Sequence, residues 1–169
     1  FRSEIYPEYK ANRPPPPQDL VPQFDIIREA TRAFGIVSIE KKGFEADDII
    51  ATLSKEANDN GAKVTIFSSD KDLMQLVSEK TLMYDPIKNS YINIDKVKEK
   101  FGVSPNKVID VQSLIGDTVD NVPGVPGIGI KTASQLISSF NTVENLIDNS
   151  DQIDKQRIRD LISLNIDNI

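Results

Sequence analysis

The glycine-rich stretch VPGVPGIGIKTASQLI, residues 122–137, constrains the fold of this chain more than any other feature. It holds two tight turns, at 123–124 and 127–129, and then an apolar pattern typical of a helix that begins near Ile130. Glycines let the backbone approach a ligand closely, and the first turn of a helix offers unpaired N–H groups to an anion. The stretch therefore predicts a tight turn that ends in an anion-binding helix start.

Polar groups stand at the same helix start, where Lys131 supplies a cation and Thr132 a hydroxyl. The spacing is too short for the G-x-x-x-x-G-K-[ST] loop of nucleotide-binding proteins. It matches a helix-hairpin-helix instead, a motif that holds a DNA backbone phosphate without reading bases. An ordinary glycine turn between two helices is the simpler alternative. On the favoured interpretation, the phosphate site consists of Gly124, Gly127, Gly129, Lys131 and Thr132.

Strand and helix patterns alternate up to about residue 94, and only helical patterns follow. The alternation predicts an α/β core at 1–94 with a mostly parallel sheet flanked by helices. The remainder, 95–169, is predicted to be an all-helical region. The predicted elements of the core are helices at 20–34, 49–60 and 71–77, strands at 36–43 and 63–67, and a hairpin formed by TLMYD and SYINI.

Acidic side chains gather where predicted strands lead into predicted helices. FEADDII contains three carboxylates in four residues, and SSDKDL contains two more at the next such junction. Because ligand sites in open α/β sheets lie at the carboxyl ends of strands, the two groups are expected to converge on one crevice. GDTVDN adds two aspartates after a later helix. The candidate set is Glu45, Asp47, Asp48, Asp70, Asp72, Asp117 and Asp120.

Two interpretations of these acids compete. Asp and Glu offset the helix dipole in a first turn, and Asp70 has the position of an N-cap. A cap needs one oxygen, however, and close carboxylates repel by about 1–4 kcal/mol per pair when nothing neutralises them. Divalent cations remove that repulsion, and two of them about 4 Å apart clamp the attacking and leaving oxygens of a phosphodiester.

The absence of histidine and cysteine supports the metal interpretation. It excludes Ser-His-Asp and Cys-His nucleophilic machinery and the thiolate or imidazole sites that zinc prefers. Carboxylate oxygens suit Mg²⁺ or Mn²⁺. The formal net charge of −6 gives no general attraction to nucleic acid, so any DNA affinity is expected to be modest and strongly salt-dependent.

The N-terminal stretch YPEYKANRP combines an aromatic residue with cations, ahead of a stiff polyproline segment at 14–17. A helix there would place Tyr9 and Arg13 on one side with Lys10 adjacent. Proteins use such a combination to stack a base and hold phosphate. The alternative is an exposed basic tail.

Four segments, EYKANRPP, EADDII, SSDKDLMQLV and GDTVDNVPGVPGIGIKTA, together resemble the 5′-3′ exonuclease (5′-nuclease) domain of bacterial DNA polymerase I, within the flap endonuclease superfamily. The resemblance covers essentially the whole chain. It implies a PIN-like core, a helical arch that includes residues 1–17, and a helix-hairpin-helix region that binds duplex DNA. It also implies phosphodiester hydrolysis at 5′ ends and 5′ flaps, as in primer removal and nick translation.

Residue roles follow from the resemblance. The seven acids correspond to the ligands of two Mg²⁺ or Mn²⁺ ions, Lys10 and Arg13 to the catalytic cations that steer the scissile phosphate, and Tyr9 to an arch aromatic. Arg2 is expected to join the DNA-binding residues, and the hairpin to hold a K⁺. The expected partner is DNA with 5′ ends, flaps, nicks or gaps. We further expect a monomer in the bacterial cytoplasm, with no membrane partner and a polymerase domain in the parent chain.

The family also carries two aspartates upstream of the segment that begins here with Phe1. We therefore expect these 169 residues alone to be catalytically weak, and a structure-specific duplex DNA-binding module is the alternative function. A topoisomerase/primase-type fold also uses a Glu and a D-x-D after strands, but it predicts neither the hairpin nor Asp117 and Asp120.

Overall fold

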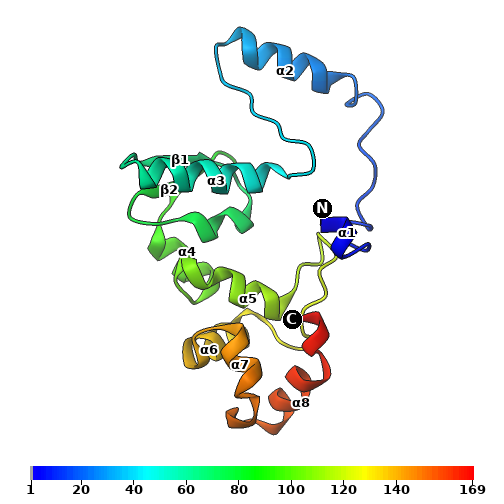
Figure 1. Ribbon diagram of the computed structural model, residues 1–169, viewed down its shortest axis with the longest axis vertical. Helices are drawn as coiled ribbons and strands as arrows, with labels where there is room; N and C mark the ends of the chain where they lie inside the picture. Colours follow the sequence, from blue (N-terminus) through cyan, green and yellow to red (C-terminus); the bar gives the residue numbers. More distant parts are fainter. Residues whose placement is uncertain (1) are drawn as a thin grey trace.

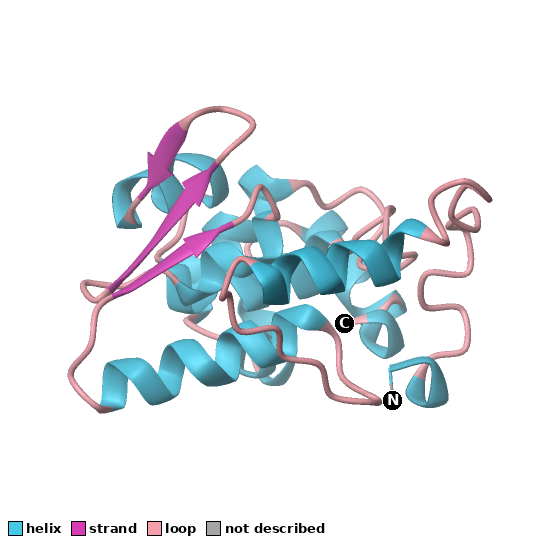
Figure 2. Cartoon of the chain, turned by 90° about the horizontal axis from the view of Figure 1, so that it is seen from above, coloured by secondary structure: helices cyan, strands magenta, loops and turns pink. Residues whose placement is uncertain are grey.

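A computed structural model of the protein describes residues 2–169. A small sheet in the order β1-β2-β3 lies beside helices (Figures 1 and 2). β1 (Val64–Phe67) pairs in parallel with β2 (Thr81–Asp85), and β2 pairs antiparallel with β3 (Ser90–Ile92). The sheet is therefore mixed, and the predicted class, an α/β core followed by a helical region, is confirmed.

Helices make up most of the remaining structure, and the chain after β3 has only helical elements in its described part. The α-helices are α1 (Arg2–Ile5), α2 (Gln23–Ala33), α3 (Ala46–Asp59), α4 (Ile94–Phe101), α5 (Val108–Ile115), α6 (Ile130–Phe140), α7 (Val143–Asp148) and α8 (Gln156–Leu164). The short 3₁₀ helices are η1 (Lys71–Leu76), η2 (Pro105–Lys107), η3 (Ser150–Gln152) and η4 (Ile166–Asn168).

The sheet buries one face only, as the alternation of side chains along a strand requires. Ile66 lies opposite Met83 in the parallel register, and both are buried. On the other face Phe67, Tyr84 and Tyr91 form a row of aromatic rings, with centroids 5.2 and 5.1 Å apart. The predicted strand at 63–67 is confirmed as β1, and Phe67 at its end is 71% exposed.

A single hydrophobic cluster joins the sheet to the helical region. Met83 of the sheet, Leu114 of α5, Leu146 of α7 and Ile162 of α8 belong to it, and each is fully buried. Helices α5, α6 and α7 pack against one another around it. This continuous core fixes the helical region relative to the sheet edge where the acids lie.

Local signals explain where several helices begin and end. The Asn93 side chain accepts a hydrogen bond from the Lys96 N–H at 3.0 Å and caps α4. Gly102 ends that helix in the left-handed conformation. The predicted helix start at Ile130 is confirmed, because α6 begins there.

The backbone crosses itself closely beside α5. Gly116 and Gly124 both have positive φ, +69° and +59°, and a Cβ added to Gly124 would lie 2.3 Å from the Gly116 nitrogen. Two hydrogen bonds between Asp117 and Val122, of 2.8 and 2.7 Å, close the intervening loop. The crossing holds the acidic GDTVDN loop against the start of the glycine-rich turn.

The predicted strand at 36–43 does not form. In the described chain these residues have no ladder partner, and Ile36, Val37 and Ile39 are each more than half exposed. A strand pattern without a neighbouring strand cannot satisfy its backbone hydrogen bonds. The segment runs as a loop between α3 and α2, and α2 lies apart from the rest of the molecule (Figure 1).

Two other local expectations need correction. The predicted helix at 71–77 is the 3₁₀ helix η1, which ends one residue earlier. Residues 6–13 form successive turns rather than an arch helix, with Lys10 at φ +58°. The other predicted helices, at 20–34 and 49–60, are confirmed as α2 and α3, and the hairpin is confirmed as β2 and β3.

Candidate active site

The first acidic group lies at the N-terminus of α3. Glu45 is the N-cap, and the Asp48 carboxylate accepts the Glu45 N–H at 2.9 Å. Arg2 donates two hydrogen bonds to Asp48, at 2.8 and 2.7 Å. This contact lowers the pKa of Asp48 to about 2. Asp48 thus has the capping role that the simpler interpretation assigned to such acids.

The N-terminal segment docks onto the loop after α5. The Lys10 N–H donates to the Asp120 carbonyl at 2.8 Å, and the Asn121 amide donates to the Glu8 carbonyl at 2.7 Å. Segments more than 100 residues apart therefore lie side by side (Figure 1). This docking brings the predicted aromatic and cationic residues to the acids.

Tyr9, Lys10 and Arg13 converge on two carboxylates. The Tyr9 hydroxyl lies 3.1 Å from Glu45 and 3.3 Å from Asp120, and the Lys10 ammonium lies 2.7 Å from Glu45. Arg13 pairs with Asp120. Burial alone would raise the pKa of Glu45, but the hydrogen bonds from Lys10 and Tyr9 and the nearby positive charges together outweigh it, and the pKa is lowered.

The second acidic group surrounds η1. Asp70 caps η1 by accepting the Asp72 N–H at 3.0 Å, and Gln112 of α5 donates to the Asp72 side chain. Between them, Lys71 extends its ammonium to 2.6 Å from Asp117. Burial opposes ionisation of Asp117, yet the Lys71 contact and the backbone N–H groups of Val119 and Asp120 together outweigh it and lower the pKa of Asp117.

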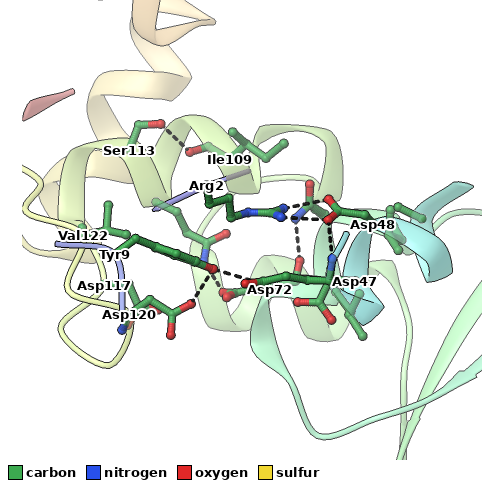
Figure 3. A pocket seen from close by; sticks show the side chains of 17 residues that line it. Arg2, Tyr9, Asp47, Asp48, Asp72, Ile109, Ser113, Asp117, Asp120 and Val122 are labelled. Atoms are coloured by element: carbon green, nitrogen blue, oxygen red, sulfur yellow. Dashed lines mark hydrogen bonds and ion pairs between the residues drawn. The ribbon is translucent and has the colours of Figure 1, made fainter. Parts of the chain in front are cut away.

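The seven predicted acids line two adjoining cavities. One, of about 450 Å³, also receives Lys10, Arg13 and Lys71. The other, of about 430 Å³, contains Asp48 together with Arg2 and Tyr9 (Figure 3). The sequence-based prediction of one pocket therefore holds for every acid but Asp48. The acids of the first cavity are Glu45, Asp47, Asp70, Asp72, Asp117 and Asp120.

For two of these acids, Asp47 and Asp72, burial is the largest influence on the pKa, and the charge of Asp70 adds to it. Burial raises the pKa of Asp47, and the Asp70 charge raises it further. Burial also raises the pKa of Asp72, against the hydrogen bond from Gln112. Carboxylates that resist ionisation next to like charges gain stability from a bound cation.

Within residues 2–169 no three acids are gathered closely enough to hold a metal ion as the side chains stand. Four of the seven are drawn to cations of the chain instead: Glu45, Asp48, Asp117 and Asp120. The donor chemistry still fits Mg²⁺ or Mn²⁺, because hard carboxylate oxygens line one cavity and positive groups already stand among them. A metal ion held by these four acids would compete with the cations that pair with them.

The glycine-rich turn presents its donors at the surface. Gly127, Gly129 and Lys131 are exposed, and Thr132 is half-buried. Across the described residues, the N–H groups of Gly127 and Gly129 have no hydrogen-bond acceptor. Gly124 is different, because it is buried in the backbone crossing. The structure gives it a role in shaping the turn rather than in contacting a phosphate.

Family models match the chain from end to end. Residues 1–102 match the 5′-3′ exonuclease N-terminal resolvase-like domain, and residues 103–169 match the 5′-3′ exonuclease C-terminal SAM fold. The chain belongs to the 5′-3′ exonuclease family. The resemblance seen in the sequence motifs is thereby confirmed.

Comparisons with individual proteins support the same family. DNA polymerase I of Rhizobium leguminosarum is 54% identical over 99% of the chain, which spans 16% of that protein. The 5′-3′ exonuclease of Aquifex aeolicus is 42% identical over 92% of the chain, which spans 54% of it. The T5 D15 protein, co-crystallized with metal ions, superposes with a TM-score of 0.86 at 26% identity, covering 98% of this chain and 66% of that one.

Sequence reasoning missed some site residues. Lys71 was not singled out, although its position between two acids in SSDKDL was a signal. Gln112 carried no signal, since an amide within an amphipathic helix is common. Arg2 was expected to bind DNA, and the structure pairs it with Asp48. As a separate finding, none of the helices in residues 2–169 combines the length and apolar character of a membrane span.

Proposed function

We propose that this chain is the nuclease part of a DNA polymerase I-type protein and hydrolyses DNA phosphodiesters from 5′ ends and at 5′ flaps, as primer removal and nick translation require. One observation carries the proposal. Acids from three separate segments and three cations line a single cavity in a chain of the 5′-3′ exonuclease family. Such a cavity suits a phosphate held between metal ions and basic side chains.

The proposed ligands of two Mg²⁺ or Mn²⁺ ions are the seven acids. The first group lies at α3, the second at η1 and in the loop after α5. Bound divalent ions would supply an acidified water nucleophile and stabilise charge on the phosphate. The T5 D15 protein, co-crystallized with metal ions, supports this proposal.

Lys10 and Arg13 are proposed to hold the scissile phosphate. Both line the acid cavity, where they now neutralise Glu45 and Asp120. Transferred to a phosphate, the same cations would stabilise the charge that develops on its oxygens. Burial raises the pKa of Tyr9, so its hydroxyl keeps its proton and can continue to orient the two carboxylates.

The hairpin is proposed to grip the duplex. Gly127, Gly129, Lys131 and Thr132 would hold a backbone phosphate through N–H groups, a cation and a hydroxyl, and a K⁺ would bind at the same turn. The division into a nuclease core at 1–94 and a DNA-binding region at 95–169 belongs to this proposal. DNA with 5′ ends, flaps, nicks or gaps is the proposed partner of a monomeric protein.

The test uses the protein that carries this chain and a 5′-flap oligonucleotide with Mg²⁺. Asp72→Asn should reduce the cleavage rate by about 100-fold or more, because it removes a carboxylate from the cavity. Asp160→Asn, on the exposed side of α8, should cleave like the unmodified protein. Cleavage without divalent cations, or cleavage unaffected by Asp72→Asn, contradicts the proposal.

A second function, a structure-specific duplex DNA-binding module, is favoured by one observation. The acids pair with the chain's own cations, and no ready-made metal cluster exists in the described residues. Salt-dependent binding to the flap oligonucleotide without cleavage at any Mg²⁺ or Mn²⁺ concentration would support this module over the nuclease.

A further inference from the structure

Lys71 is a cation built into the acidic cavity itself. It lies between Asp70 and Asp72 in η1, and its ammonium reaches 2.6 Å from Asp117 in a loop more than 40 residues away. The Asp117 side chain is only 12% exposed, and that of Lys71 is 37% exposed. This ion pair therefore lies largely inside the cavity.

The lysine is charged in this position. Its ammonium forms an ion pair with Asp117, and the acids Asp70 and Asp72 flank it in the sequence. Lys71 thus neutralises Asp117, whereas Asp120 of the same loop pairs with Lys10 and Arg13.

Lys71 differs from the other cations of the cavity in its attachment. Lys10 and Arg13 belong to a segment of turns that docks on the acids from a distance in sequence. Lys71 is the first residue of η1, between its N-cap Asp70 and Asp72, so its backbone is fixed beside these acids. Its ammonium, 2.6 Å from Asp117, takes up one oxygen of a carboxylate that a divalent ion would also need.

We propose that Lys71 is a positioning residue that holds the Asp117 carboxylate in the metal-free protein and releases it when a divalent cation binds. The inference rests on the proposed metal-dependent function. Because the two cations compete for one carboxylate, Lys71 stabilises the metal-free protein and weakens divalent-ion binding by the same interaction. A lysine with a purely structural role would not weaken metal binding.

The experiment compares Lys71→Met, Lys71→Arg and a control in the protein that carries this chain. Methionine keeps the length of the side chain and removes its charge, while arginine keeps the charge. The control is Lys55→Met, which breaks the exposed Lys55–Asp59 pair of the same 2.6 Å length on α3. Free Mn²⁺ is measured by electron paramagnetic resonance during titration, and thermal unfolding is followed with and without Mn²⁺.

Lys71→Met is expected to bind Mn²⁺ about fivefold more tightly, which corresponds to about 1 kcal/mol for a partly buried ion pair. Its metal-free form should melt at a lower temperature, and saturating Mn²⁺ should restore most of the loss. Lys71→Arg and Lys55→Met should bind Mn²⁺ like the unmodified protein.

Unchanged or weaker Mn²⁺ binding by Lys71→Met would overturn the inference and leave the nuclease proposal intact if the unmodified protein still cleaves the flap. Should the unmodified protein bind no Mn²⁺, both proposals fail together. If Lys71→Met does not fold, Lys71→Gln replaces it, and the same direction of change in Mn²⁺ affinity decides the question.

Discussion

Single carboxylates of the cavity differ in what neutralises them, and this difference separates their roles. Asp48 has both an arginine and a backbone N–H as partners, whereas Asp47 forms no ion pair among the described residues. An acid with paired oxygens contributes to stability without metal. An acid held next to like charges without a cationic partner would gain more from a bound cation.

Asp48 should make stability depend on acid pH. Its pKa is lowered to about 2, below the usual value of about 3.9, so its contribution is present above pH ~4 and is lost as the pH falls toward ~2. Urea unfolding in metal-free buffer should show a steeper loss of stability over this window than in Asp48→Asn. Asp167→Asn, at an exposed aspartate, should keep the pH dependence of the unmodified protein. If Asp48→Asn shows that same pH dependence, the role assigned to Asp48 is wrong.

Gly124 is a second residue with a sharp prediction. Alanine there would have a positive φ and a Cβ 2.3 Å from backbone, so Gly124→Ala should lose at least about 3 kcal/mol of unfolding free energy. Gly61 also has positive φ, but a Cβ there meets nothing within 4 Å. Gly61→Ala should therefore lose only about 1–2 kcal/mol. Equal losses in chemical denaturation would show that the crossing is looser than described.

At the scale of elements, local signals predicted the helices better than the strands. Caps and glycines lie within a few residues of the helix ends that they determine, as Gly61 does after α3 and Gly102 after α4. The strand expected at 36–43 had the right alternation, but a strand also needs a neighbour that its own sequence does not specify. The fold class was predictable because helix ends are set by nearby residues. The absence of the strand was not predictable because strand formation depends on a distant partner.

Helix α5 connects the acidic loop to the core, and its buried face should dominate its energetics. Leu114 is fully buried, whereas Ile109 on the same helix is 57% exposed. Leu114→Ala should reduce the unfolding free energy by about 2–5 kcal/mol because it leaves a cavity. Ile109→Ala should change it by about 0.5 kcal/mol or less. Denaturant titration of both variants checks the difference, and similar losses would place Ile109 in the core.

At the scale of the whole molecule, the gathering of the acids was predictable and their pairing was not. The N-terminus of α3 and the segment after β1 bring Asp47 and Asp72 to one cavity, although the strand expected before α3 does not form in the described chain. The partners of Glu45 and Asp120 depend on how residues 6–13 dock against a loop more than 100 residues away. No local pattern encodes such a contact, so the sequence pattern and the family resemblance singled out Tyr9, Lys10 and Arg13, but only the structure shows which acids they contact.

Divalent cations should stabilise the whole protein, since they bind the folded arrangement of acids and not the unfolded chain. At a Mg²⁺ concentration of about 100 times the dissociation constant, the gain should be about 2.7 kcal/mol. Differential scanning calorimetry should show a rise in melting temperature that chelation reverses. The double variant Asp117→Asn with Asp120→Asn should show a much smaller rise, and an equal one would move the binding site elsewhere.

The crossing of Gly116 and Gly124 has a consequence for the product of the proposed reaction. One face of the crossing leads to the acidic loop, and the other leads to the turn proposed to grip the duplex. Main-chain atoms, with no side chains between them, thus set the distance between the acids proposed to cleave the DNA and the turn proposed to hold it. Surface substitutions can change how fast or how tightly the protein works, but the length of the released fragment should change only when residues are inserted or deleted between these two glycines.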